Sequence, residues 1–157
     1  MASKVRLLNG KVIVEKLPEG GQDESLERVV SPQRSPKGEM VQIVNKKGAG
    51  KGFKHIVYCE LKRGKGKTRG SHLHQRKTEF VYVVSGKVKL WVRDEELSKQ
   101  ETHVLDRGDK VTIKPKVCHT YEGLAISSFL EYSYGSYDSS DTCSCHVLTD
   151  RFSGLKK

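Results

Sequence analysis

Short runs of β-branched and aromatic residues recur along the chain, and turn residues separate them. No segment keeps an amphipathic helical period over about 11 residues, so a parallel α/β sheet is disfavoured. Along residues 87–93 aliphatic side chains alternate with polar or aromatic ones, the period of a half-buried strand, and Ser85-Gly86 offers a two-residue hairpin turn. The pattern predicts an all-β antiparallel barrel or sandwich. Strands are expected at residues 41–44, 55–61, 79–84, 87–93, 103–105, 111–113 and 126–132.

The N-terminal part predicts a β-hairpin followed by a surface arm. Asn9 and Gly10 lie between two apolar runs, and both tolerate a positive φ. Residues 18–40 are polar and contain Gly-Gly and Ser-Pro pairs, which break helix and strand periods. The 157 residues amount to about one domain. We expect the hairpin and arm at residues 1–40, a barrel at 41–140 and a tail at 141–157.

Apolar runs and cysteines bear on location and redox state. No window approaches the about 18 consecutive apolar residues of a membrane span, and the first residues lack the apolar core of a secretory signal. The sequence therefore predicts a cytoplasmic protein with no membrane partner. Without an export signal the four cysteines are interpreted as free thiols: Cys59, Cys118, Cys143 and Cys145. The roles of Cys143 and Cys145 are left open, because Cys-x-Cys without a second pair is a poor zinc signature.

The chain is basic, with a formal net charge of +10. Nine lysines and arginines against one acid, Glu60, lie between residues 46 and 69. Such a density favours anionic partners and could neutralise a diphosphate; a solvated basic loop is the alternative. Nucleic acid is not favoured, because only Phe53 and Tyr58 are available there to stack on bases.

Three residues near the middle of the chain suit a metal site. In a strand, residues i and i+2 share a face, so His72 and His74 would present two imidazoles to one point. Glu79 opens the next β-rich run after a short connection. Two neutral nitrogens and one anionic oxygen form a set that divalent metals prefer.

Extended along the chain, this pattern resembles the cupins. Their first motif is matched from Gly66 to Gly86, and their second runs from Gly108 to His119, with departures at the turn around Lys114. The resemblance implies a small β-barrel of double-stranded β-helix, or jelly-roll, type. It also implies a divalent transition metal (Zn, Mn, Fe, Ni or Co) whose ligands would be His72, His74, Glu79 and His119.

Residues 69–74 (Arg-Gly-Ser-His-Leu-His) carry a narrower resemblance, to the sugar-nucleotide 3,5-epimerases and 3,4-ketoisomerases. In those groups the histidines move protons beside a ketone and no metal is needed. His72 and His74 are therefore open between metal ligand and base. Residues 137–142 are also similar to the acidic segment of sugar-phosphate isomerase-like cupins; a solvated turn is the alternative.

Three classes of function remain. The preferred one is an isomerase or epimerase acting on a sugar phosphate or nucleotide sugar; the others are a metal-dependent dioxygenase and a non-catalytic small-molecule-binding barrel. In the preferred class one imidazole of the metal set could be the base, with Tyr82 or Tyr121 as its acid partner, although both tyrosines also suit core packing. Arg69 and Lys67 would hold the anionic substrate.

The sequence also predicts a homodimer. An isolated small barrel has edge strands that must be covered, and the hairpin at residues 5–14 is an element that could add to a partner's sheet. The resemblance to cupins points the same way.

Overall fold

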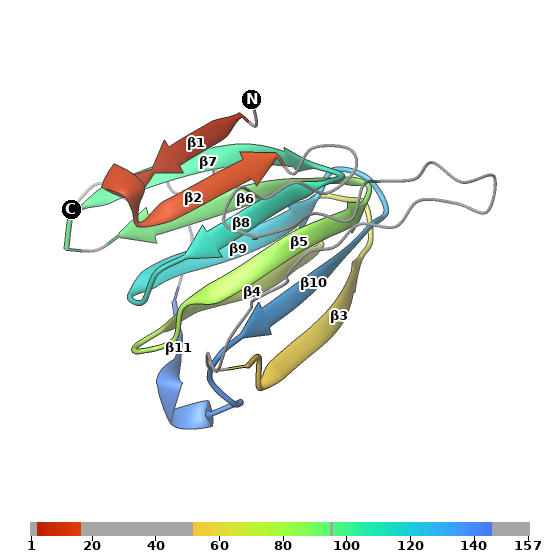
Figure 1. The fold of residues 1–157 in the computed structure, drawn as a ribbon. Helices are drawn as coiled ribbons and strands as arrows, with labels where there is room; N and C mark the ends of the chain where they lie inside the picture. The colour runs from red at the N-terminus through yellow and green to blue at the C-terminus, as the bar shows by residue number, and fades with distance from the viewer. Residues whose placement is uncertain (1–2, 17–51, 95, 146–157) are drawn as a thin grey trace.

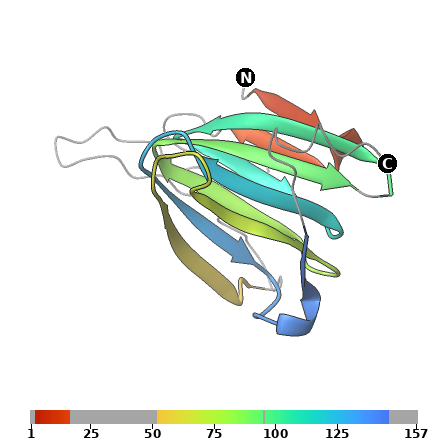
Figure 2. The ribbon, with the colours of Figure 1, turned by 180° about the vertical axis from the view of Figure 1, so that it is seen from behind.

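A computed structural model describes residues 3–16, 52–94 and 96–145, which form two antiparallel β-sheets packed face to face (Figures 1 and 2). Two 3₁₀ turns, η1 (Leu8–Gly10) and η2 (Ser139–Asp141), accompany the strands. In chain order the strands are β1 (Lys4–Leu7), β2 (Val12–Lys16), β3 (His55–Leu61), β4 (Thr68–His74), β5 (Glu79–Ser85), β6 (Lys87–Asp94), β7 (Lys99–Asp106), β8 (Asp109–Ile113), β9 (Val117–Gly123), β10 (Ser127–Ser133) and β11 (Thr142–Ser144).

The chain alternates between the sheets, as a jelly roll requires. The six-stranded sheet has the order β1-β2-β8-β5-β10-β3, and the five-stranded sheet has the order β11-β4-β9-β6-β7. From β3 to β6 each strand lies in the other sheet from the one before it. The predicted all-β jelly-roll fold is therefore confirmed.

The hydrophobic core lies between the two sheets. Val81 and Val111 of the six-stranded sheet and Leu90 of the five-stranded sheet are at most 1% exposed, and Phe129 joins the same cluster. In each strand the neighbours of such residues point outward, which is the period-two pattern expected of a strand with one face buried. At one end of the sandwich, the same alternation turns polar side chains toward the space between the two sheets.

The predicted N-terminal hairpin is present. β1 pairs with β2, and Asn9 and Gly10 have φ values of 55° and 85° in the turn between them. β2 then pairs with β8 of the same chain, with Val14 opposite Val111. The hairpin thus extends its own sheet, with β1 at the edge. The expectation that it adds to a partner's sheet stays a prediction.

Two other local expectations have mixed outcomes. Residues 55–61 form β3 as predicted, whereas the predicted strand at 41–44 lies outside the described residues. The prediction of a hairpin turn at Ser85-Gly86 is wrong, because β5 and β6 belong to different sheets and the chain crosses between them there. Gly86 has a φ of +82°, and a Cβ there would lie 2.4 Å from the carbonyl oxygen of Ile126. Glycine is needed for this close crossing.

The interpretation of all four cysteines as free thiols is wrong for two of them. Cys118 of β9 forms a disulfide with Cys145, which follows β11, while Cys59 and Cys143 carry free thiols. The two partners are 27 residues apart, and only the return of β11 to the five-stranded sheet brings them together. This β11 pairing also places residues 142–144, part of the predicted tail, at the edge of that sheet. Nowhere in the described part of the chain is there a helix with the length and apolar character needed to cross a membrane.

Candidate functional site

The histidine and glutamate residues singled out from the sequence converge at one end of the sandwich. β4 supplies His72 and His74, β5 begins with Glu79, and β9 supplies His119. Each offers one nitrogen or oxygen atom, and these four atoms all lie within 4.8 Å of one another. Three strands from two sheets therefore aim four potential metal ligands at a single point.

An irregularity in β4 sets the position of His72. The pairing of β4 with β9 shifts register between Gly70 and His72, so that His72 lies directly opposite His119. Gly70 has a φ of +91°, and a Cβ on it would lie 2.8 Å from the carbonyl oxygen of His119. Such a β-bulge re-aims the side chains that follow it, and here it turns His72 toward the interior.

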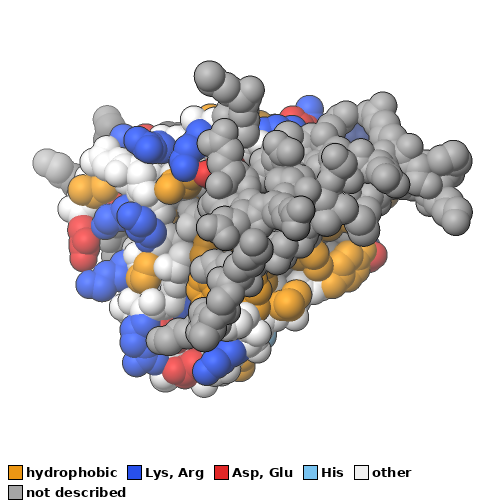
Figure 3. Space-filling view, in the orientation of Figure 1, with side chains coloured by type: hydrophobic (Ala, Val, Ile, Leu, Met, Phe, Trp, Pro, Cys, Tyr) orange, Lys and Arg blue, Asp and Glu red, His pale blue; other side chains and the backbone are white. Residues whose placement is uncertain are grey.

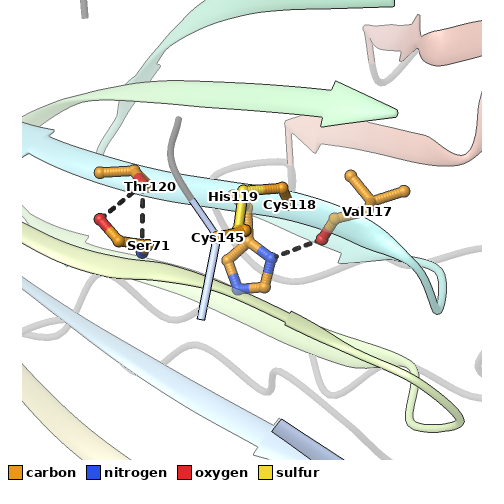
Figure 4. The surroundings of a disulfide bond; sticks show 6 residues. All are labelled: Ser71, Val117, Cys118, His119, Thr120 and Cys145. Atoms are coloured by element: carbon orange, nitrogen blue, oxygen red, sulfur yellow. Dashed lines mark hydrogen bonds between the residues drawn. A yellow bond between two sulfur atoms is a disulfide. The ribbon is translucent and has the colours of Figure 1, made fainter. Parts of the chain in front are cut away.

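The ring of His119 is held by its own strand. Its Nδ1 lies 3.0 Å from the carbonyl oxygen of Val117, as Figure 4 shows. A carbonyl oxygen can only accept, so Nδ1 carries a hydrogen and donates it. The Nε2 atom then faces the cluster, 3.2 Å from Oε1 of Glu79.

Glu79 lies between two of the histidines. Its Oε2 is 3.0 Å from Nε2 of His74, and its Oε1 faces His119. Although burial opposes ionisation, the charge and hydrogen bond of His119 hold the pKa of the Glu79 carboxyl well below its usual range. For His119, burial acts in the opposite direction, yet the nearby Glu79 carboxylate raises the pKa of the imidazole.

His72 and the far side of His74 complete the electrostatics. Burial and the neighbouring charge of His119 lower the pKa of His72 to about 4, so its ring is neutral at physiological pH. On the outer side of His74, Nδ1 faces Asp141 Oδ2 at 3.5 Å and Thr142 Oγ1 at 3.4 Å. Carboxylates in this position behind a histidine commonly fix the ring of a metal ligand.

The donor set fits a divalent metal. Among the described residues, Nε2 of His72, Nε2 of His119 and Oε1 of Glu79 are buried side-chain atoms without a hydrogen-bond partner. Buried polar atoms normally find a partner, so several such atoms aimed at one point indicate that a positively charged partner belongs there. Three imidazoles and one carboxylate suit Zn, Mn, Fe, Ni or Co.

The cluster opens into a cavity of about 230 Å³. His72, His74 and Glu79 form its inner part. The rest of its wall comes from the ends of β3, β10 and β11 and from the connections beside them: His55, Lys77, Glu131, Tyr132, Ser133, Tyr137 and Thr142. A metal bound by the cluster would therefore be reachable by a small molecule.

Glu131 is a cavity residue that the sequence did not indicate. It lies on β10 opposite Val81 and Val57 and so points between the sheets, where glutamate is uncommon. Burial, together with the negative charge of Glu79, raises the pKa of Glu131 to about 7. Burial and the charge of Glu131 in turn raise the pKa of the Cys59 thiol to about 11. No motif surrounds Glu131; its signal would have been an acid at an inward position of an apolar strand.

The structure separates the two candidate tyrosines. Tyr121 is 1% exposed between His119 and Phe129, and burial raises its pKa well above the usual value, so its phenol stays protonated. Tyr82 lies on the outer side of β5, packed with Tyr132 in a second apolar cluster. Tyr121 thus adjoins the cluster of histidines and glutamate, whereas Tyr82 does not.

The expected anion-binding residues also lie elsewhere. Arg69 is exposed and its Nε donates to the carbonyl oxygen of Glu60, while Lys67 is exposed in the turn before β4. Neither lines the cavity, and among the described residues Lys77 is the lysine that does. On the part of the face that Figure 3 leaves visible, lysine and arginine side chains lie at several places, with uncharged and acidic side chains between them.

The acidic segment at residues 137–142 belongs to the cavity rather than to a solvated turn alone. Tyr137 and Thr142 line the cavity, and Asp141 is buried beside His74. Asp141 accepts a hydrogen bond from the backbone N–H of Arg76, and its own carbonyl accepts one from Gln75. A second hollow of about 370 Å³ lies on the other side of this segment and shares Lys77 with the first.

Comparison with known proteins finds a family model that matches part of the chain. Residues 58–125, which include all four members of the histidine and glutamate cluster, match the family model of the cupin domain. Over these residues the chain is similar to a cupin domain. Among curated proteins no sequence matches the chain significantly.

Solved structures share the cupin fold at low sequence identity. The sugar 3,4-ketoisomerase QdtA from Thermoanaerobacterium thermosaccharolyticum, in complex with TDP, has a TM-score of 0.64 and 18% identity over 85% of this chain and 87% of its own. The dTDP-6-deoxy-D-glucose-3,5-epimerase RmlC from Legionella pneumophila, in complex with dTDP-4-keto-L-rhamnose, has a TM-score of 0.67 and 16% identity, over 94% and 79%. A 3,4-ketoisomerase from Helicobacter canadensis has a TM-score of 0.60 and 15% identity, over 72% and 84%.

Proposed function

We propose that this chain is a metal-binding cupin enzyme that isomerises or epimerises a nucleotide sugar or sugar phosphate. The observation that carries the proposal is the cluster of His72, His74, Glu79 and His119, three of whose members line a cavity that also holds an ionisable carboxylate, Glu131. The likeness to sugar-nucleotide ketoisomerases and an epimerase supports this substrate class over other cupin substrates.

The chemistry needs a polarised carbonyl and a base for the neighbouring C–H proton. A divalent metal held by the cluster would supply a Lewis acid for that carbonyl or an adjacent hydroxyl. If all three histidines hold the metal, none of them is free to act as the base. The carboxylate of Glu131 then takes that role, because it lines the same cavity and its pKa of about 7 is close to working pH.

Without metal, the roles change within the same cavity. His72 stays neutral, and its Nε2 has no hydrogen-bond partner among the described residues, so it can accept a hydrogen bond from a substrate hydroxyl. Tyr121 keeps its proton and adjoins His119, which makes it the better placed of the two candidate acids. Lys77 at the cavity wall is the side chain we assign to the substrate's negative charge.

The test follows proton transfer directly. Metal-loaded protein is incubated with nucleotide sugars and sugar phosphates in deuterium oxide, and mass spectrometry and NMR follow deuterium at the carbon next to the carbonyl. Glu131→Gln should lower the exchange rate by about 10²–10⁴-fold while metal still binds. Glu60→Gln makes the same change on the exposed face of β3 and should leave exchange unaltered.

Other outcomes select the other classes. The intact set of three histidines and one glutamate also suits a redox metal, so oxygen consumption on another small molecule without exchange would assign a metal-dependent dioxygenase. Binding of sugar nucleotides with neither activity would assign a non-catalytic barrel. We propose a cytoplasmic location, which cell fractionation tests.

A further inference from the structure

A disulfide crosses the outer face of the strand that carries two of the cluster histidines. Cys118 lies in β9, next in sequence to His119, and its sulfur bonds to Cys145 beyond the end of β11 (Figure 4). The backbone N–H of Cys145 donates to the carbonyl oxygen of Ser71 in β4, so the chain passes over β4 on its way to Cys118. The bridge therefore fastens the C-terminal end of the described chain to β9.

The fastened segment is a wall of the cavity. Tyr137 and Thr142 line the cavity, and Asp141 and Thr142 are the groups behind the ring of His74. The position of this wall thus affects both access to the cluster and the orientation of one of its histidines.

Few other interactions hold this wall in place. β11 is three residues long, and it pairs with β4 alone. The ion pair between Arg76 and Asp138 has an arginine side chain that is 70% exposed, and exposed pairs contribute little to stability. Asp141 adds its two hydrogen bonds to the β4–β5 connection. The disulfide is the strongest single link between this segment and the rest of the sheet.

We propose that the Cys118–Cys145 disulfide is a redox switch: a dithiol reductant opens it, releases the cavity wall formed by residues 137–145 and weakens metal binding by the cluster. The expected weakening of metal binding rests on the metal site put forward under the proposed function. Cys145 is partly exposed whereas Cys118 is buried, so the attack falls on Cys145. In the proposed cytoplasmic location a disulfide is more often redox-sensing than structural.

The reaction is ordinary thiol–disulfide exchange. A thiolate of the dithiol bonds to the Cys145 sulfur, the S–S bond breaks, and Cys118 leaves as a thiolate that takes up a proton. The second thiolate of the reductant then displaces Cys145. The protein gains two thiols, and the reductant becomes a disulfide.

The first measurement establishes the bridge and the movement. Under denaturing conditions without reductant, alkylation should modify Cys59 and Cys143 only, and all four cysteines after reduction. Reduction should make backbone amide hydrogen exchange in residues 142–144 at least about tenfold faster, with residues 87–94 of β6 unchanged. Four reactive thiols before reduction, or equal exchange in both states, would overturn the proposal.

The second measurement tests the link to the metal site. Titration with Zn²⁺ should give an affinity about 10–100-fold weaker for Cys118→Ser/Cys145→Ser than for oxidised wild type, the size of effect expected when groups behind a ligand are lost. Using the variant keeps metal-binding reductants out of the titration. Cys143→Ser keeps the bridge, so its Zn²⁺ affinity should match that of the oxidised wild type. If the double variant does not fold, reduced wild-type protein, desalted to remove the reductant, is titrated in its place.

The two proposals fail separately. Faster exchange with unchanged Zn²⁺ affinity would overturn the switch and leave the metal site intact. Absence of Zn²⁺ binding in both redox states would reject the metal site, and the exchange result would then decide the switch alone.

Discussion

Two glutamates share the interior of the cavity, and their surroundings drive their ionisation in opposite directions. Glu79 has His74 and His119 as neighbours, and these keep its pKa low despite burial. For Glu131, burial and the negative charge of Glu79 disfavour the ionised carboxylate and raise its pKa to about 7. Pairs of titratable groups with diverging pKa values are typical of sites that divide roles, which agrees with the proposal that Glu79 ligates a metal and Glu131 moves protons.

Glu131→Gln should make the metal-free protein more stable at alkaline pH. The pKa of Glu131 is raised from 4.5 to about 7, so folding favours its protonated form. The contribution of the protonated Glu131 side chain to folding stability is intact below pH 4.5 and is lost as the pH rises through about 7. The difference between these two pKa values corresponds to about 3 kcal/mol of unfolding free energy. Urea unfolding in the presence of a chelator should show the variant up to about 3 kcal/mol more stable at pH 8, with this advantage absent at pH 4. An advantage of equal size at both pH values would contradict the assignment.

Metal binding should release a proton from His119. The Glu79 carboxylate raises the pKa of His119, whereas His72 is already neutral above about pH 4, so His119 is a ligand from which a metal must displace a proton. Zn²⁺ affinity should therefore rise about tenfold per pH unit below the pKa of His119 and level off above it. Calorimetry in buffers of different ionisation enthalpy measures the released proton. Affinity that does not change with pH around neutrality would show that the metal does not bind at His119.

At the scale of elements, the β-bulge in β4 determines whether the cluster can form. Gly70→Ala should be destabilising for two reasons, a positive φ and a Cβ 2.8 Å from the carbonyl oxygen of His119. Gly66→Ala is the matched control, because Gly66 has a φ of +78° but no atom within 4 Å of its Cβ position. Gly66→Ala should lower the free energy of unfolding by about 1–2 kcal/mol because of its positive φ alone. Gly70→Ala should lower it by about 1–3 kcal/mol more, because its Cβ also meets the backbone of β9.

Metal binding should distinguish the same two variants. Gly70→Ala pushes β4 and β9 apart where His72 lies opposite His119, so its Zn²⁺ affinity should fall, while Gly66→Ala should bind as wild type does. Thermal unfolding measured with and without Zn²⁺ reports both quantities. Equal costs for the two variants would show that the close approach at Gly70 is not needed.

The sequence predicted those parts of the fold and site that local patterns specify. His72, His74 and Glu79 follow one another within two adjacent β-rich runs, so period-two alternation places them correctly. Lys77 was missed because nothing in the sequence marks it among the other lysines, although it lies between His74 and Glu79. Glu131 was missed because it reaches the cavity through the pairing of β10 with β5, two segments distant in sequence, for which no local pattern exists. The crossing at Ser85-Gly86 looked like a hairpin for the same reason, since turn chemistry does not reveal which sheet the next strand enters.

At the scale of the whole molecule, the unpaired edges of the two sheets bear on the proposed homodimer. Among the described residues β1 and β3 are the outer strands of the six-stranded sheet. The hairpin that contains β1 is already joined to β8 of its own chain, and β1 is only four residues long. β3 has seven residues, and its Ile56 and Tyr58 are 64% and 59% exposed. A long edge with exposed apolar side chains is the better candidate for pairing with a second copy.

We therefore expect the chain to dimerise through β3. Light scattering at micromolar concentration should give about twice the chain mass of 17.7 kDa, and Ile56→Lys/Tyr58→Lys should reduce it to the monomer value, because lysines on an edge strand oppose pairing. Val104→Lys is the control: Val104 is 43% exposed on β7, at the edge of the other sheet, and its substitution should leave the dimer intact. A wild-type mass near 17.7 kDa would reject the dimer. A dimer that survives both lysines on β3 but dissociates in Val104→Lys would move the interface to β7, on the side of the sandwich away from β3 and the cavity.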